Sequence, residues 1–117
     1  MGRNVLIVED NEETREVFGH LLSSFHSKTA ASRDEALEII NSGFSPSCIL
    51  MDYMMPGMSL PDFLDKAKQF KSQVVLTTAF ADAKAAADIA GVACSLQKPI
   101  PAQILVRVVE QVVGSQG

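Results

Sequence analysis

Acidic, hydroxyl and amino side chains stand at the ends of four apolar runs in this sequence. These residues are Glu9 and Asp10 after NVLIV, Asp52 after CILM, Thr77 and Thr78 at the end of VVLTT, and Lys98 after VACSLQ. An ionised carboxylate such as that of Asp52 is costly in an apolar setting unless it is paired or binds a cation. Asp52 is therefore expected to have either a structural partner or a chemical function.

The three carboxylates predict a magnesium site if their segments meet in space. Such groups repel one another, and a cation between them allows all three to stay ionised. Mg²⁺ prefers hard oxygen ligands, keeps several waters and commonly bridges to phosphate. Lys98 as a point charge and Thr78 as a hydroxyl donor would complete a clamp for a phosphoryl group. Asp52 is then a candidate nucleophile that forms an aspartyl phosphate.

Strand-like and helix-like patterns alternate along the chain and predict how these residues are positioned. Strand patterns cover residues 4–8, 27–31, 48–51, 74–78 and 92–96. Helix patterns cover residues 12–24, 32–40, 60–70, 81–91 and 101–113. This alternation predicts an α/β fold in which a five-stranded parallel sheet has helices on both faces. Ligands in such sheets gather at the carboxyl ends of the strands, where the polar residues above are expected to meet.

The first and last helix patterns also predict which side chains are buried. The predicted core face of the first comprises Val17, Phe18, Leu21, Leu22 and Phe25. The predicted core face of the last comprises Ile104, Leu105, Val108 and Val112. Three further apolar residues of this helix, Val106, Val109 and Val113, are not needed for that face. The surplus valines either mark a partner or dimer surface or are scattered over a frayed last turn. Residues 113–117 are expected to be a tail or the start of a linker.

Composition narrows the class of protein. With 117 residues, 47% of them hydrophobic, the chain is expected to form one domain over residues 1–117. A net charge of −4 and scattered lysines and arginines argue against direct binding of nucleic acid. Cys48 and Cys94 lie in apolar stretches without metal-ligand spacing, which indicates buried thiols in a reducing compartment. No apolar run reaches the roughly 18 residues of a membrane span, so we expect a cytoplasmic protein that does not bind membranes.

Four motifs together resemble the receiver domain of two-component response regulators. They are VLIVEDN, ILMDYMMPGM, VVLTTA and QKP, in the order and at the separations typical of that family, and the resemblance covers about residues 3–113. It implies the flavodoxin-like fold of the chemotaxis receivers, with strand order 2-1-3-4-5 and five helices. It also implies a signalling switch rather than an enzyme, one that catalyses only its own phosphorylation and slow autodephosphorylation.

The resemblance implies a role for each matching residue. Glu9 and Asp10 would be the acidic pair that holds Mg²⁺, Asp52 the phosphoacceptor and metal ligand, the Met54 main-chain carbonyl a further metal ligand, Thr78 the switch hydroxyl, and Lys98 a contact of the phosphoryl group. Lys98–Pro99 is expected to be a cis bond. The competing interpretations are that Glu9 and Asp10 cap the first helix, that Thr77 takes the role of Thr78, and that Lys98 is an ordinary solvated lysine.

This chain departs from the family pattern at several positions. Ser59 and Leu60 replace the acid and glycine that usually follow MPxM, which predicts a different loop before the third helix. Ser95 stands where an aromatic switch residue is expected, so signalling by rotation of a ring is in doubt. Met54 and Phe80 would flank the path of a hydrolytic water, and apolar side chains there crowd the water without orienting it. We therefore expect a long-lived phosphorylated form.

Three classes of function follow. The leading hypothesis is a phosphorylation-dependent switch. A sensor histidine kinase or a phosphotransfer protein would donate to Asp52, and the face from the fourth to the fifth helix would bind a downstream protein or a second copy. The alternative is a scaffold that binds its partner without phosphorylation, a hypothesis that Ser95 supports. A phosphatase of the haloacid-dehalogenase type is disfavoured because Met54 occupies the place of its second acid.

Overall fold

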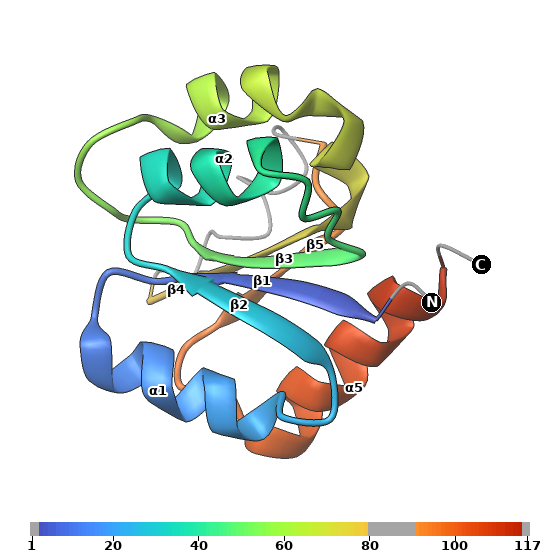
Figure 1. Ribbon diagram of the computed structural model, residues 1–117. Coiled ribbons are helices and arrows are strands. Elements are labelled where there is room, and N and C mark those ends of the chain that lie inside the picture. The colour runs from blue at the N-terminus through green and yellow to red at the C-terminus, as the bar shows by residue number, and fades with distance from the viewer. Residues whose placement is uncertain (1–2, 80–90, 116–117) are drawn as a thin grey trace.

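The computed structural model describes residues 3–79 and 91–115, which form a five-stranded parallel sheet with helices on both faces (Figure 1). The strands are β1 (Asn4–Val8), β2 (His26–Ala30), β3 (Cys48–Asp52), β4 (Val74–Thr78) and β5 (Cys94–Gln97). They lie in the order β2-β1-β3-β4-β5, and every neighbouring pair is parallel. The predicted α/β class and strand order are confirmed.

Helices cover the sheet as two layers. They are α1 (Glu12–Leu21), α2 (Arg33–Asn41), α3 (Leu60–Lys66), the 3₁₀-helix η1 (Lys68–Gln73) and α5 (Ala102–Gly114). Figure 1 shows α1 and α5 on one face of the sheet and α2 and α3 on the other. The helix predicted over residues 81–91 lies almost wholly outside the described residues. No helix in the described part of the chain is long and apolar enough to cross a membrane.

Each face of the sheet packs its own apolar core, because alternate side chains of a strand point to opposite faces. On the α2/α3 side, Leu6, Ile49 and Met51 contact Phe63 and other buried residues. On the α1/α5 side, the core includes Val5, Ile7, Leu50, Phe18 and Leu105. The central strands are buried on both faces, which explains why they appear in the sequence as continuous apolar runs.

The predicted core face of the first helix was wrong at one position. Val17 is 53% exposed, whereas Phe18, Leu22 and Phe25 are buried. The buried residues are spaced by four and three positions, so they form a narrow stripe, and Val17 lies about 100° away from Phe18 around the helix. The helix also ends at Leu21 rather than Ser24, and Phe25 reaches the core from the turn that follows.

The predicted helix over residues 60–70 is divided into two elements. The α-helix ends at Lys66, and η1 begins after Ala67, whose φ of −120° and ψ of 36° are not helical. The Phe70 N–H then donates to the Ala67 carbonyl at 2.9 Å, the shorter bond spacing of a 3₁₀-helix. Ala67 and Phe70 both remain buried, so the break preserves the apolar face. No glycine or proline in KAKQFKSQ signals it.

The face that the last helix buries matches the predicted one only in part. Leu105, Val109, Val112 and Val113 are buried, Val106 and Val108 are half-buried, and Ile104 is 39% exposed. Two of the valines predicted as surplus therefore belong to the core. The sequence offered seven apolar residues on this helix, and packing against β1, β3 and α1 decided which of them are covered. The helix continues to Gly114, so residue 113 is not part of a tail.

Helix capping follows the sequence closely. The Ser32 hydroxyl accepts a hydrogen bond from the Glu35 N–H at 3.1 Å, and the Glu35 carboxylate accepts one from the Ala31 N–H. Ser32 and Glu35 thus form the reciprocal bonds of a capping box, except that Glu35 accepts from the residue before the cap. The strand boundaries of β2 and β5 differ from the predicted ones by one or two residues.

Candidate functional site

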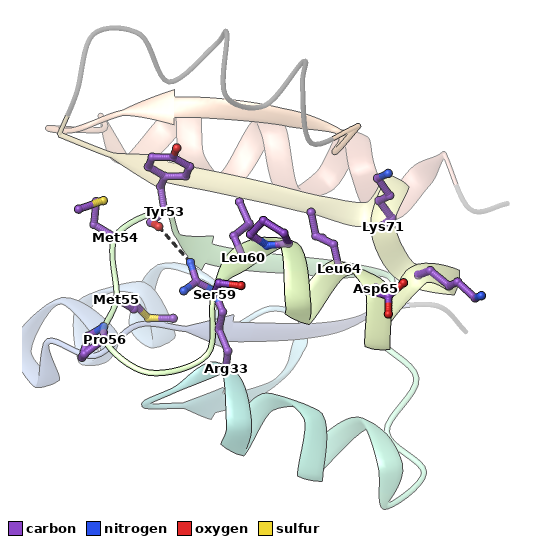
Figure 2. Close-up of a pocket in the computed structure, with 12 residues that line it drawn as sticks. Arg33, Tyr53, Met54, Met55, Pro56, Ser59, Leu60, Leu64, Asp65 and Lys71 are labelled. Carbon is purple, nitrogen blue, oxygen red and sulfur yellow. Dashed lines mark hydrogen bonds between the residues drawn. The ribbon is translucent and has the colours of Figure 1, made fainter.

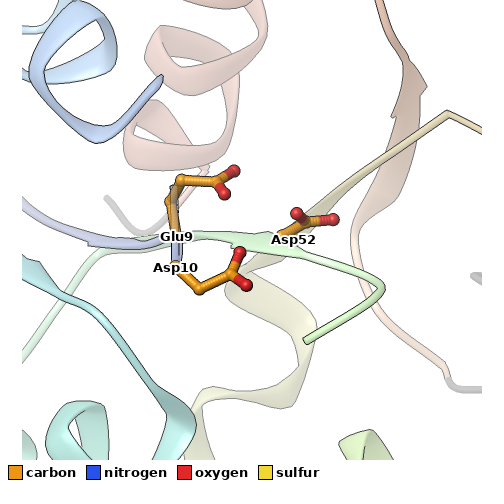
Figure 3. A group of neighbouring side chains, drawn as sticks. All are labelled: Glu9, Asp10 and Asp52. Carbon is orange, nitrogen blue, oxygen red and sulfur yellow. The ribbon is translucent and has the colours of Figure 1, made fainter. Parts of the chain in front are cut away.

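Three carboxylates meet at the carboxyl end of the sheet (Figure 3). Glu9 and Asp10 directly follow β1, and Asp52 is the last residue of the neighbouring strand β3. One ligand oxygen from each residue lies within 4.8 Å of the others. The parallel topology explains this arrangement, because it aligns the ends of β1 and β3 although 42 residues separate Asp10 from Asp52 in the sequence.

A lysine from the edge strand reaches the same cluster. Lys98 Nζ lies 3.3 Å from Asp52 Oδ2 and 3.4 Å from Glu9 Oε1. The Lys98 N–H donates to the Thr78 carbonyl at 2.7 Å, which fixes the chain at the point where β5 ends. The Lys98–Pro99 bond is cis, as the resemblance implies. The structure thus brings four of the predicted site residues together.

Burial disfavours the charged form of one carboxylate in the cluster. The Glu9 side chain is almost fully covered, and its pKa is raised chiefly by this burial, with a further contribution from the charge of Asp52. The Asn11 N–H, at 3.0 Å from Glu9 Oε2, and the Lys98 ammonium act in the opposite direction. One ammonium therefore faces three carboxylates, and the site carries excess negative charge.

The donor set fits a hard divalent cation. The oxygens converge on one volume, the excess charge is negative, and Asp10 remains exposed so that water can complete a coordination sphere. Mg²⁺ binds to few protein oxygens and keeps its remaining waters. Glu9, Asp10 and Asp52 are therefore the residues that would hold such an ion.

The loop after Asp52 is pinned to the cluster through Met54. The Met54 N–H donates to Asp52 Oδ1 at 3.2 Å, while the Met54 side chain is 58% exposed. Ser59 closes the loop as the N-cap of α3, where its hydroxyl accepts from the Asp62 N–H at 3.2 Å. Leu60 is buried in the first turn of that helix. The departure from the family pattern at residues 59 and 60 thus provides a helix cap and a core contact.

The two threonines of β4 are both buried but differ in their surroundings. Thr77 pairs in register with Asp52, and its hydroxyl has no hydrogen-bond partner among the described residues. Thr78 stands two residues after Leu76 and therefore on the same face of the sheet, the α2/α3 side, where Leu76 belongs to the core. Ser95 is half-buried in β5, in register with Leu76. Phe80 lies outside the described residues.

Burial also accounts for the cysteines. Cys48 is fully buried in β3, and burial raises the pKa of its thiol to about 12. Cys94 is half-buried, and burial raises its pKa as well. Cys48 is the buried free thiol that the sequence predicts, whereas Cys94 is only partly covered.

Arg33 is a site neighbour that the sequence did not reveal. Its side chain is 2% exposed and donates to the main-chain carbonyls of Asp52 and Tyr53 at 3.1 and 3.0 Å. The sequence indicated only scattered basic residues, and an arginine in the first turn of a helix usually faces solvent. No local pattern distinguishes it, since its partners lie at least 18 residues away.

A large hollow lies next to the site, along the β3–α3 loop and α3 (Figure 2). It has a volume of about 1120 Å³ and a mostly apolar lining that includes Tyr53, Met54, Leu60 and Leu64. None of the three carboxylates lines it. The acidic cluster is therefore a separate feature, open to solvent at Asp10.

Comparisons with known structures agree with this architecture. The chemotaxis response regulator CheY4 of Vibrio cholerae is 25% identical, with a TM-score of 0.79, over 93% of this chain and 97% of that one. The receiver domain of Ssk1 from Saccharomyces cerevisiae, crystallised with the histidine phosphotransfer protein Ypd1, is 26% identical. Its TM-score is 0.83, over 97% of this chain and 90% of that one.

A third structure supports the fold alone. The receiver domain of the Francisella response regulator 1452 is 22% identical, with a TM-score of 0.85, over 97% of this chain and 98% of that one. A search of curated proteins gave no match. The family model of the response regulator receiver domain matches residues 5–110. Together with the parallel sheet and the acidic strand ends, this match shows that the chain belongs to the response regulator receiver domain family.

Proposed function

We propose that this chain is a phosphorylation-dependent signalling switch whose phosphoacceptor is Asp52. The observation that carries the proposal is the placement of Lys98 Nζ between Asp52 and Glu9, with Asp10 beside them. A nucleophilic carboxylate, a cation-binding pair and a lysine positioned for a phosphoryl oxygen are the parts that aspartyl phosphorylation requires.

The proposed reaction is an in-line transfer. An Asp52 carboxylate oxygen attacks the phosphorus of a phosphohistidine, and a new P–O bond forms as the P–N bond breaks. The electron pair of the broken bond stays on the imidazole nitrogen. Lys98 stabilises negative charge on the transferred group, and the Thr78 hydroxyl donates to it in the phosphorylated state.

The metal supplies charge neutralisation. Mg²⁺ held by Glu9, Asp10, Asp52 and the Met54 main-chain carbonyl would offset the repulsion between the carboxylates and the incoming phosphoryl oxygens. The protein contributes the fixed strand ends that keep these oxygens together. Beyond its own phosphorylation and slow autodephosphorylation, we propose no catalytic activity for the chain.

The donor is proposed to be a sensor histidine kinase or a histidine phosphotransfer protein. A relative of 26% identity has been crystallised with a phosphotransfer protein. In this chain, a hollow of about 400 Å³ beside Lys98 is lined by Phe18, Pro99 and Ile100, and Val17 is exposed on the same helix as Phe18. These apolar side chains support docking of a helical donor next to the acidic cluster.

The output is proposed to pass through the face between the helix predicted over residues 81–91 and α5, to a downstream protein or a second copy. Ser95 favours a second candidate, a scaffold that binds its partner without phosphorylation. A half-buried serine in β5 cannot fill the space of a ring. A switch in this chain would therefore have to act without an aromatic side chain at that position.

Labelling with acetyl phosphate separates the two candidates. We expect wild-type protein with Mg²⁺ to gain one phosphoryl group by intact mass, and Asp52→Ala to gain none. Asp65→Ala, which removes an exposed aspartate of α3, is the matched control and should label like the wild type. A wild type that stays unlabelled by acetyl phosphate and by kinases alike would favour the scaffold.

A further inference from the structure

The guanidinium of Arg33 is buried beneath the loop that follows Asp52. Figure 2 shows its side chain rising from α2 to that loop and bonded to the Tyr53 carbonyl. Four of the five N–H donors that a guanidinium carries have acceptors. These are the Met51 sulfur at 3.4 Å and the carbonyls of Asp52, Tyr53 and Met58 at 3.1, 3.0 and 3.0 Å.

These bonds join the two ends of one loop. Asp52 and Tyr53 stand at its start, and Met58 stands directly before the cap of α3. Neither Nη1 nor Nη2 of Arg33 forms an ion pair with a carboxylate within residues 3–79 and 91–115. Three of its four acceptors are therefore main-chain carbonyls of the loop. Burial lowers the pKa of the Arg33 guanidinium, and the charge of Asp52 acts in the opposite direction.

The bond to Tyr53 has a direct consequence for the phosphoacceptor. In a trans peptide the C=O and N–H groups point in opposite directions. The Tyr53 carbonyl accepts from Arg33 on one side of the Tyr53–Met54 peptide, and the Met54 N–H donates to Asp52 Oδ1 on the other. A hydrogen bond from a charged donor also polarises the peptide and strengthens its N–H as a donor.

We propose that Arg33 is a positioning residue that orients the Tyr53–Met54 peptide toward Asp52 and so prepares the site for Mg²⁺ and the phosphoryl group. The inference rests on the proposed function and adds a residue to it. Arg33 acts through the peptide and touches neither reacting group. Lysine cannot replace it fully, because a single ammonium lacks the planar fork that reaches both ends of the loop.

The test compares Arg33→Met, Arg33→Lys and the control Arg107→Met, which alters an exposed arginine of α5. Hydrogen exchange of the Met54 amide reports on the peptide itself. Mg²⁺ affinity can be followed by the fluorescence of Tyr53, the only tyrosine in a chain without tryptophan. Acetyl phosphate labelling gives the rate of phosphorylation, and circular dichroism verifies folding.

In Arg33→Met we expect the affinity for Mg²⁺ and the rate of labelling by acetyl phosphate each to fall about 10-fold to 100-fold. This is the usual range for residues that orient metal ligands. Its Met54 amide should exchange faster, while Arg107→Met matches the wild type. Arg33→Lys should keep the fold and recover these properties only in part. If Arg33→Met does not fold, the Met54 exchange and Mg²⁺ affinity of Arg33→Lys alone test the proposal.

Two results would overturn the proposal. One is a folded Arg33→Met protein with wild-type Met54 exchange and wild-type Mg²⁺ affinity, and the other is full recovery in Arg33→Lys. Failure of the proposed function looks different, because the wild type itself would then stay unlabelled. Met54 exchange in the variants would still decide whether Arg33 orients the peptide.

Discussion

Lys98 Nζ lies 3.3 Å from Asp52 Oδ2, although 46 residues separate the two in the sequence. The same ammonium lies 3.4 Å from Glu9 Oε1. The side chain of Lys98 is 30% exposed and that of Asp52 12% exposed, so the contact is partly shielded from solvent. One cation thus links the ends of β1, β3 and β5, and its removal tests both stability and chemistry.

Lys98→Met is expected to slow labelling by acetyl phosphate about 10²-fold to 10³-fold, the cost of removing one oriented charge-stabilising group. Without Mg²⁺ it should also lower the free energy of unfolding by about 1 to 3 kcal/mol, between the values of exposed and buried ion pairs. Urea unfolding and intact mass measure the two effects. Lys66→Met, on the exposed side of α3, is the control, and equal labelling of the two variants would refute the role of Lys98.

Thr77→Val should change stability, whereas Thr78→Ala should change phosphorylation. The buried Thr77 hydroxyl has no partner among the described residues, so valine should raise the free energy of unfolding by about 1 kcal/mol and leave labelling unchanged. Thr78→Ala removes the hydroxyl proposed to contact the phosphoryl group. It should slow labelling by acetyl phosphate or weaken the conformational response of the protein to phosphorylation. Slower labelling in Thr77→Val alone would assign the role to Thr77.

Met54→Asn is expected to shorten the lifetime of the aspartyl phosphate several-fold. The Met54 side chain is exposed two residues after Asp52, where an amide can orient a hydrolytic water and a thioether cannot. Decay of the labelled protein, followed by mass spectrometry after removal of acetyl phosphate, measures this. Met54→Leu keeps an apolar side chain and should decay like the wild type, whereas slower decay in Met54→Asn would contradict the prediction.

Val17→Glu should weaken transfer from a phosphorylated phosphotransfer protein about 10-fold and leave labelling by acetyl phosphate unchanged. A charge at this exposed apolar position would have to be desolvated on docking, whereas a small donor needs no docking surface. Asn41→Glu introduces the same charge on α2, which covers the opposite face of the sheet. Equal rates of phosphoryl transfer to the two variants would show that α1 is not part of the docking surface.

Glu9→Gln is expected to stabilise the metal-free protein at pH 7. The raised pKa of Glu9 means that the folded state holds its proton more tightly than the unfolded state does. Stability of the metal-free wild type should therefore fall as pH rises above about 4.5 through the folded pKa. Thermal unfolding across this range should show a smaller decline for Glu9→Gln.

With Mg²⁺ present, the wild type should become the more stable of the two proteins. In the wild type Mg²⁺ offsets the repulsion between the carboxylates and should raise the melting temperature, since a ligand that binds only the folded state stabilises it. Glu9→Gln should gain less from the same Mg²⁺ concentration. An equal gain in both proteins would remove Glu9 from the metal site.

Local patterns in the sequence were sufficient for most of the fold. Apolar runs such as residues 4–8 and 74–78 become strands because burial on both faces requires them to be continuous. Ser32 caps α2 because a hydroxyl can satisfy the free N–H groups of the first turn. The division of the third helix escaped prediction, because no residue within it signals a break.

The sequence by itself determined which residues end the strands, and therefore that Glu9, Asp10, Asp52 and Lys98 share one edge of a parallel sheet. Tertiary structure alone decided that Val17 is exposed and that Arg33 is buried under the loop after Asp52. Strand ends follow from local periodicity and parallel topology, both visible along the chain. Burial of a single side chain depends on contacts between distant segments, which no local pattern records.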